Sequence, residues 1–298
     1  MKILLFGSTG QVGWELQRSL APLGEVIALQ HRTPSDGLCG DVSDLLGLAQ
    51  TIRNVRPDVI VNAAAHTAVD KAEGEQELAL HLNAQAPEVM ALQAQSLGAL
   101  LVHYSTDYVF DGSGFTARKE GDTTGPLSVY GRTKLEGEQR IEATGCRHLI
   151  FRTSWVYAAR GRNFAKTMLR MAQENDELSV INDQWGAPTG ADLIADVTAH
   201  AIRHVTARDH DLGLYHLVAG GATTWHAYAS YVIAQAKILR PELPWKVQHV
   251  AAVPTAAFPA AAQRPLNSRL STAKLQAVMQ LHLPAWQQGV DRVLREIL

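Results

Sequence analysis

Short apolar runs alternate with amphipathic stretches along the first half of the chain. Residues 2–6 form an apolar run that ends at a glycine, a pattern typical of a strand buried on both faces of a parallel sheet. Val12, Leu16 and Leu20 then recur at four-residue intervals, which predicts a helix that Pro22 and Gly24 end. Residues 26–29 read as a second strand, so the chain opens with a βαβ unit.

The same alternation continues over most of the chain. We expect strands at residues 59–61, 100–104, 148–152, 179–182 and 215–218, and helices at about 45–52, 78–96, 129–142, 164–173, 191–204 and 225–239. Strands separated by helices predict an α/β fold with a doubly wound, Rossmann-like parallel sheet. The Ala/Pro-rich residues 251–262 are expected to form an exposed loop.

The less regular second half predicts a smaller α/β lobe for the substrate. We assign residues 1–158 and 179–220 to a dinucleotide-binding domain, and residues 159–178 and 221–298 to a substrate-binding lobe.

Composition narrows the class of partner. Lys and Arg (27) nearly balance Asp and Glu (29), which argues against nucleic acid or an anionic membrane and favours a small molecule. The five-residue apolar start is too short for a signal peptide, and no run approaches a membrane span. Cys39 and Cys146 are too few for a disulfide framework, so we expect a cytoplasmic protein.

A glycine-rich turn joins the first strand to the first helix. Gly7, Gly10 and Gly13 form a G-x-x-G-x-x-G pattern. Glycine permits a tight turn and lets a pyrophosphate approach the backbone, while the helix N-terminus offers free N–H groups to the anion. In this βαβ context the pattern predicts a dinucleotide site.

The end of the second strand bears on the choice between NADPH and NADH. An NAD site has an acidic residue here, whereas this chain has Gln30, His31 and Arg32. A guanidinium can pair with a 2′-phosphate, so we expect NADPH, with NADH as the alternative if Arg32 is only a solvated loop residue.

Further along, two segments suit other parts of such a cofactor. Asp41 and Val42 suit contact with the adenine, although a helix N-cap is an equal interpretation of Asp41 and its neighbours. Alanines at 63–65 follow a strand and allow close approach of a ribose and pyrophosphate.

Tyr130 and Lys134 stand four residues apart on a predicted helix. That spacing places both on one face, where an ammonium favours the phenolate and lowers the tyrosine pKa toward neutrality. Reduction of a ketone by hydride needs such a proton donor. Thr106, at the carboxyl end of residues 100–104, can donate a hydrogen bond to the same carbonyl oxygen.

Several motifs together resemble the extended short-chain dehydrogenase/reductase family, and within it the reductases of keto-sugar nucleotides. The matching segments are residues 7–13 (GSTGQVG), 62–73 (NAAAHTAVDKAE), 105–112 (STDYVFDG), 151–157 (FRTSWVY), 163–169 (NFAKTML) and 182–189 (NDQWGAPT), with the Y-x-x-x-K of Tyr130 and Lys134. This resemblance implies that Tyr130 protonates C4 oxygen of a dTDP-4-keto-6-deoxy sugar, that Lys134 binds the nicotinamide ribose, and that Thr106 adjusts the acid. The product would be the dTDP-linked rhamnose used for lipopolysaccharide O-antigen and other cell-surface polysaccharide.

The resemblance also implies binding residues. Cofactor contacts are expected from Gly7, Gly10, Gln11, Val12, Gln30, Arg32, Asp41, Val42, Ala65, His66, Thr67, Tyr104, Tyr130 and Lys134. Substrate contacts are expected from Thr106, Asp107, Trp155, Asn163, Trp185, Arg264 and Asn267. Some relatives form a Mg²⁺-bridged homodimer, for which Glu15 and Asp192 are the nearest candidates here.

Two other functions share this scaffold. A nucleotide-sugar dehydratase or epimerase is disfavoured because the dehydratase pattern has Thr-Asp-Glu where this chain has Thr106, Asp107 and Tyr108. A non-catalytic regulatory subunit, like that of methionine adenosyltransferase, is disfavoured because Thr106, Tyr130 and Lys134 are all present.

Overall fold

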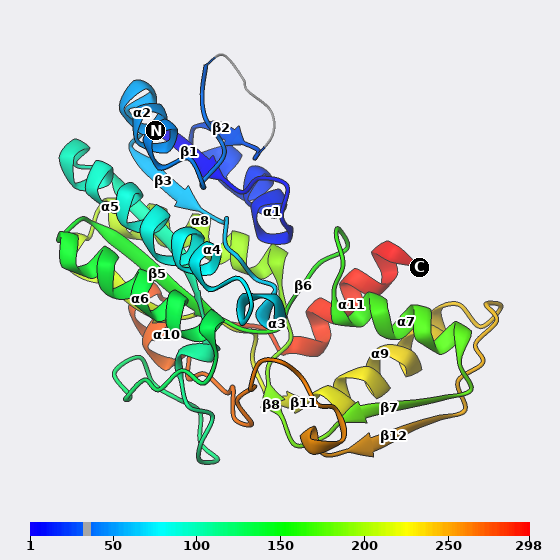
Figure 1. Ribbon diagram of the computed structural model, residues 1–298. Coiled ribbons are helices and arrows are strands. Elements are labelled where there is room, and N and C mark those ends of the chain that lie inside the picture. The colour runs from blue at the N-terminus through cyan, green and yellow to red at the C-terminus, as the bar shows by residue number, and fades with distance from the viewer. Residues whose placement is uncertain (32–36) are drawn as a thin grey trace.

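A computed structural model describes residues 1–31 and 37–298 of the chain. Within them, six parallel strands form the central sheet in the order β2–β1–β3–β4–β5–β10 (Figure 1). Their bounds are β1 Lys2–Phe6, β2 Glu25–Leu29, β3 Val59–Asn62, β4 Leu100–Thr106, β5 His148–Thr153 and β10 Gly213–His216. The predicted doubly wound, Rossmann-like sheet is confirmed, since solved structures described below share this fold.

Helices cover both faces of this sheet, as the continuous apolar strands require. Ile3 and Leu5 of β1 point to one hydrophobic core, and Leu4 and Phe6 to the other. The first core is closed by α1 (Gln11–Leu20), α8 (Ala191–Thr206) and α10 (Ala273–Met279). The second core is closed by α2 (Leu45–Val55), α5 (Ala86–Leu97) and α6 (Val129–Thr144).

The helix expected at about residues 78–96 is interrupted in its first half. It consists of α4 (Gln76–Leu80), a π-helical turn (His81–Gln85) and α5, after the short helix α3 (Val69–Ala72). Pro87 has no N–H and its ring would clash with the carbonyl of Asn83 in a regular α-helix, so the wider turn relieves that clash. The π-helical turn packs closely on α6, where a Cβ on Gly137 would lie 2.1 Å from the Asn83 oxygen.

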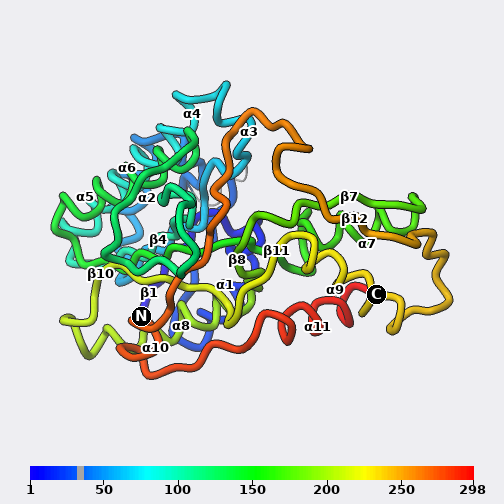
Figure 2. Tube along the Cα trace, turned by 90° about the horizontal axis from the view of Figure 1, so that it is seen from below, coloured from blue at the N-terminus to red at the C-terminus, as the bar shows by residue number. Residues whose placement is uncertain are grey.

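Apart from α8, β10 and α10, which belong to the sheet and its covering helices, most of the chain after residue 156 builds a second lobe beside the sheet (Figures 1 and 2). Its helices are α7 (Phe164–Glu174), α9 (Trp225–Leu239) and α11 (Trp286–Ile297), and its main strands are β7 (Glu177–Ile181) and β12 (His249–Val253). Tyr157, Tyr228 and Trp286 are buried in its core. Four two-residue strands lie between the lobe and the sheet: β6 (Val156–Tyr157), β8 (Trp185–Gly186), β9 (Thr189–Gly190) and β11 (Thr223–Thr224).

The loop expected at residues 251–262 is partly wrong. Residues 251–253 belong to β12, which pairs in parallel with β7, and only the part after them is largely exposed. The valines and alanines of β12 pair through their backbone with β7 in a two-stranded sheet. This pairing with a distant segment leaves no periodic pattern in the sequence.

Candidate active site

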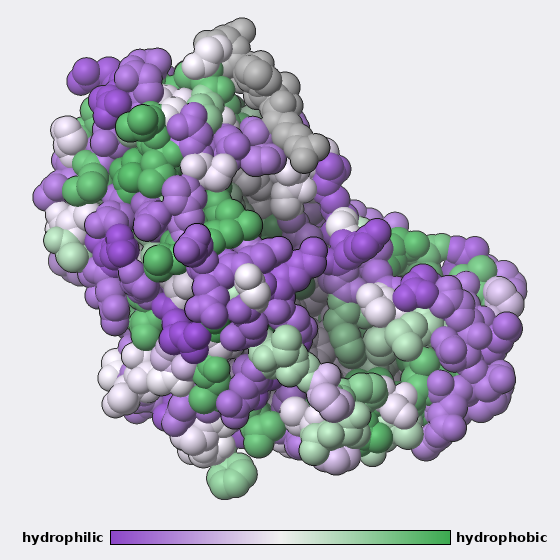
Figure 3. Space-filling model, in the orientation of Figure 1, coloured by the Kyte–Doolittle hydropathy of each residue, from purple (hydrophilic) through white to green (hydrophobic). Residues whose placement is uncertain are grey.

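A cavity of about 590 Å³ opens at the carboxyl ends of the central strands. The strand order reverses between β1 and β3, and ligands bind outside such a switch point in doubly wound sheets. In Figure 3 the surface is hollowed between the larger body and the lobe at the right. The lining includes the predicted residues Gly7, Gly10, Gln11, Val12, Val42, Ala65, Thr67, Tyr104, Thr106, Asp107, Tyr130, Lys134 and Trp155.

The glycine turn has the close backbone contacts that the pattern predicts. Gly7 has φ +78°, and a Cβ there would lie 2.7 Å from the Ala63 carbonyl carbon. A Cβ on Gly13 would lie 2.0 Å from the Gly7 oxygen, so α1 packs against the turn without room for a side chain. Gly10, in contrast, has φ −69° and would place a Cβ 3.4 Å from that oxygen.

We expect Gly13→Ala to lower the thermal unfolding midpoint clearly, because backbone rather than a flexible side chain blocks the added methyl. Gly10→Ala is the matched control, since its backbone conformation suits alanine and the contact is looser. It should unfold near the wild-type temperature. Thermal denaturation of both variants checks this, and equal midpoints would contradict it.

These residues fit a dinucleotide. The glycine turn leaves a cradle that any side chain on Gly7 would fill, and α1 begins there with no side-chain cap on its first N–H groups. Ser105 Oγ, Asp107 Oδ2 and Thr153 Oγ1 are buried, line or adjoin the cavity, and have no hydrogen-bond partner among the described residues. Buried polar groups without partners are costly, which supports a polar ligand in this cavity.

Tyr130 lies in the cavity as predicted, but the predicted effect of Lys134 on its pKa is wrong for the protein alone. Burial raises the pKa of Tyr130 to about 12, and contact with the Thr106 hydroxyl opposes this only in part. Lys134 Nζ is occupied elsewhere: it lies 2.6 Å from the Tyr104 oxygen and 3.0 Å from His103 Nε2. Burial lowers the pKa of Lys134 to about 8. Tyr130 therefore holds its proton at neutral pH, as a proton donor must.

The hydroxyl group of Thr106 is hydrogen-bonded within the protein. Its Oγ1 donates to Asp107 Oδ1 at 3.0 Å and accepts from the Tyr108 N–H at 3.2 Å. The single hydroxyl proton is therefore not free for a carbonyl oxygen while Asp107 accepts it. Burial raises the pKa of Asp107 to about 6, so its carboxyl group is partly protonated just below neutral pH.

Trp155 lies over the cavity in a strained backbone conformation. Its φ is +47°, in the left-handed region that bulky residues rarely adopt. The indole stacks on Trp225 with ring centroids 3.5 Å apart, and a Cβ on Gly186 would lie 2.5 Å from Trp155 Cε2. Trp225 also lines the cavity, a residue that sequence reasoning missed because its only signal is its place at a helix start.

Three expected cofactor residues lie outside the cavity lining. Gln30 is exposed after β2, and Asp41 Oδ1 accepts from the Ser43 N–H at 2.8 Å and lies 3.1 Å from His31 Nδ1. The helix cap here is Asp44, which accepts from the Gly47 N–H. His66 is buried, with Nε2 2.7 Å from Glu75. Arg32 lies outside the described residues.

Four residues expected to bind the substrate also make contacts with other residues of the protein. Asn163 Nδ2 donates to Gln11 Oε1 at 3.1 Å, which ties α7 to the glycine turn. The amide of Asn267 is occupied by Ser113 and Thr116 oxygens and by Arg269. Trp185 is 41% exposed with Arg269 over its ring. Arg264 forms a two-armed ion pair with Asp70 of α3, so its guanidinium bridges the two lobes.

The residues do not fit the Mg²⁺ site. Glu15 lies beside Arg18, and Asp192 lies 3.0 Å from Arg292. Residues 1–31 and 37–298 contain no group of three or more His, Cys, Asp or Glu side chains that could hold a metal ion. Arginine already neutralises each candidate carboxylate, so the expected Mg²⁺ is not supported.

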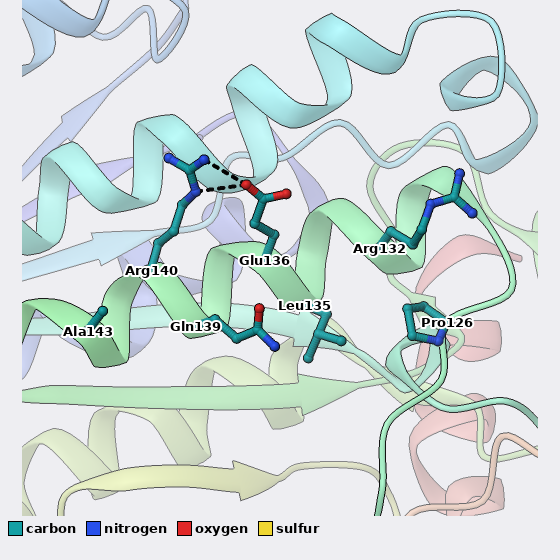
Figure 4. A pocket seen from close by; sticks show the side chains of 7 residues that line it. All are labelled: Pro126, Arg132, Leu135, Glu136, Gln139, Arg140 and Ala143. Atoms are coloured by element: carbon teal, nitrogen blue, oxygen red, sulfur yellow. Dashed lines mark hydrogen bonds and ion pairs between the residues drawn. The ribbon is translucent and has the colours of Figure 1, made fainter.

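A second hollow lies on the outer face of α6 and is different in character. Pro126, Leu135, Gln139 and Ala143 line it together with Arg132 and the Glu136–Arg140 ion pair (Figure 4). The Arg140 guanidinium donates to Glu136 at 2.6 and 2.9 Å, so the two opposite charges pair with each other.

In the part of the chain that the structure describes, no helix is long and apolar enough to cross a membrane.

Known proteins are similar to this chain over its whole length. A dTDP-4-dehydrorhamnose reductase from Shigella flexneri is 58% identical over 297 residues, which cover 100% of this chain and 98% of that protein. A solved dTDP-4-dehydrorhamnose reductase from Clostridium acetobutylicum has a TM-score of 0.88 at 33% identity and covers 100% of this chain and 99% of its own. One from Bacillus anthracis, in complex with NADP, has a TM-score of 0.87 at 32% identity and covers 99% of both chains. The family described as the RmlD substrate binding domain matches residues 1–298, and this chain belongs to that family, among the dTDP-4-dehydrorhamnose reductases.

Proposed function

We propose that this protein reduces the C4 keto group of dTDP-4-dehydro-L-rhamnose to dTDP-L-rhamnose with NADPH. The observation that carries the proposal is the convergence of Tyr130, Thr106 and Lys134 in one cavity with the glycine turn. The 58% identity to a dTDP-4-dehydrorhamnose reductase over the whole chain supports the choice of sugar nucleotide.

Each group of residues in the cavity has a separate role in the proposed reaction. Bound NADPH supplies the hydride. The glycine turn and the start of α1 hold its pyrophosphate, Lys134 its nicotinamide ribose, and Thr67, Ala65 and Val42 lie along the same cavity. Tyr130 donates its phenolic proton to the C4 oxygen as the alkoxide forms. Trp155, which follows β5, and Trp225 of α9 in the second lobe cover the cavity and exclude water from the reacting atoms.

Turnover distinguishes this proposal from the alternatives. Purified protein mixed with NADPH and dTDP-4-dehydro-L-rhamnose should oxidise NADPH and form dTDP-L-rhamnose in equal amounts over many turnovers. A regulatory subunit would bind NADPH without turnover, and a dehydratase would act on a different sugar without net NADPH oxidation. The place of Tyr108 after Asp107, where a dehydratase carries glutamate, favours the reductase.

We expect kcat/KM with NADPH to exceed that with NADH. The residues directly after β2, Gln30 and His31, carry no carboxylate that would repel a 2′-phosphate, and Arg32 follows them in the sequence. Arg32→Ala should lower kcat/KM with NADPH by about tenfold and leave that with NADH nearly unchanged, since a charged hydrogen bond contributes about 1.5–3 kcal/mol. Steady-state kinetics with both cofactors check this; equal efficiencies unaffected by the substitution would contradict it.

Three broader features belong to the same proposal. Residues 159–178 and 221–298 form most of the substrate lobe, but α10 packs on the central sheet and all of β7 pairs with β12 of the lobe. Arg264 is released from Asp70 to meet the diphosphate. Cys39 and Cys146 are free thiols, which supports a cytoplasmic location. The homodimer that the resemblance implies is part of the proposal as well, and sedimentation velocity of the purified protein tests it.

A further inference from the structure

A buried chain of hydrogen bonds runs from the cofactor cavity to Lys134. The Ala64 N–H donates to Asn62 Oδ1 at 3.1 Å. Asn62 Nδ2 lies 3.1 Å from His103 Nδ1, and His103 Nε2 lies 3.0 Å from Lys134 Nζ. Asn62 and His103 are 2% and 1% exposed, so water does not replace these contacts. Asn62 and Ala64 both line the cavity.

The chain has a definite direction. The Ala64 N–H needs an acceptor, so the Asn62 oxygen faces it and the Asn62 amide nitrogen must donate to His103 Nδ1. A neutral imidazole carries one proton, which therefore sits on Nε2 and points at Lys134. His103 is neutral, since burial holds the pKa of its imidazole well below the usual value.

A histidine N–H that points at Lys134 requires a lone pair there. The lysine must be a neutral amine, which accepts from His103 and donates to the Tyr104 oxygen. An ammonium has no lone pair and would oppose the histidine proton. The described arrangement is therefore the neutral state of Lys134.

A charged Lys134 requires the chain to reverse. The ammonium would donate to a bare Nε2, the ring proton would sit on Nδ1, and the Asn62 amide would turn its oxygen toward that proton. Overall one proton is taken up and rests on Lys134, while the imidazole stays neutral. The turned amide no longer accepts from Ala64, so the Ala64 N–H becomes free for a ligand in the cavity.

The other titratable groups around Lys134 in the described residues do not take part in this exchange, because only His103 has two neutral tautomers. Glu138, one turn along α6, favours the ammonium but is paired with Arg152 of β5 at 2.6 Å. Tyr130 and Asp107 face the cavity. On the α3 and α5 sides, Glu73 accepts from the Val129 N–H and Glu88 pairs with Arg140.

We propose that His103 is a positioning residue that couples the charge of Lys134 to the Ala64 amide in the cofactor cavity, by moving its ring proton between Nε2 and Nδ1. The coupling rests on the proposed function for its role in catalysis. Because it is reciprocal, a cofactor oxygen that takes the Ala64 N–H stabilises the charged lysine, and a charged lysine strengthens cofactor binding.

The direct test is the ¹⁵N NMR spectrum of histidine-labelled protein without substrate. We expect the His103 signal, identified by its loss in His103→Gln, to show a neutral ring throughout about pH 6 to 10, with its proton on Nδ1 at low pH and on Nε2 at high pH. Saturating NADP⁺ should move the midpoint of this exchange to higher pH. One unchanged tautomer, a charged ring, or a midpoint indifferent to NADP⁺ would overturn the proposal.

Two variants separate coupling from a merely structural role. Asn62→Asp offers only acceptors, so one oxygen should hold the ring proton on Nδ1 across the same range while the other keeps the Ala64 N–H, and NADP⁺ binding should no longer depend on this titration. His103→Gln should abolish the dependence of the NADP⁺ dissociation constant on this titration. Loss of affinity with the pH dependence unchanged would contradict the coupling. These measurements need no sugar nucleotide, so failure of the proposed reaction would leave them interpretable.

Discussion

Tyr130→Phe is expected to lower kcat by at least about 10²-fold while NADPH still binds. The substitution removes one hydroxyl from a partly buried ring that lines the cavity and leaves the cavity shape intact, so the loss falls on proton donation to the C4 oxygen. The pKa of Tyr130, raised to about 12 by burial, means that wild-type Tyr130 is protonated throughout the neutral range. The rate should therefore show no limb from this tyrosine below about pH 9.

A second tyrosine, outside the cavity, serves as a matched control. It shows whether removing a phenolic hydroxyl lowers kcat in general or only at Tyr130. Tyr231 is on α9, and its hydroxyl donates to Asp291 at 2.8 Å, away from the cavity. Tyr231→Phe should retain wild-type kcat. NADPH affinity from fluorescence titration should be similar for both variants. Near-normal turnover by Tyr130→Phe would remove this tyrosine from the role of general acid.

Arg152→Met is expected to destabilise the protein by about 3–5 kcal/mol, because it leaves the Glu138 carboxylate buried without its partner. The two side chains are 4% and 3% exposed, and Arg152 meets both oxygens of Glu138 at 2.6 to 3.2 Å. Such a pair joins β5 to α6, the helix that carries Tyr130 and Lys134. Urea unfolding measures the loss.

The double variant Arg152→Met with Glu138→Leu tests the cause. Without either charge it should regain much of the lost stability, since an apolar pair of similar volume often matches a buried ion pair. Arg170→Met is the exposed control: Arg170 and Glu174 are 63% and 53% exposed, so the change should cost at most about 1 kcal/mol. A double variant as unstable as Arg152→Met would show that packing, rather than the unpaired carboxylate, accounts for the loss.

The parts of the site that sequence reasoning placed correctly in the cavity depend on local pattern. Gly7, Gly10 and Gly13 have a spacing that a strand, a tight turn and a helix impose together, and Tyr130 and Lys134 are brought to one face by helix geometry alone. Thr106 follows from the rule that parallel strands bring their carboxyl ends to one edge. These inferences needed only neighbours within a few residues and the order of the strands.

Other features depend on partners that are far away in the sequence. Periodicity predicted one helix over residues 78–96, but the carbonyl of Asn83, the ring of Pro87 and the crossing of Gly137 produce a π-helical turn. β12 was missed because its strand pairing with β7 lies about 70 residues away. Arg264 was assigned to the substrate from the family resemblance, whereas its position opposite Asp70 follows from how the two lobes meet.

Side-chain chemistry shows the same division. The i, i+4 spacing correctly put Lys134 and Tyr130 on one helix face, yet which group the lysine nitrogen contacts is decided by His103 and the Tyr104 carbonyl on β4. Local pattern determines which residue types reach the cavity, because helix and strand geometry are short-range. Their pKa values and hydrogen-bond partners are decided by tertiary packing, because burial and electrostatic contacts depend on distance in space and not on distance along the chain.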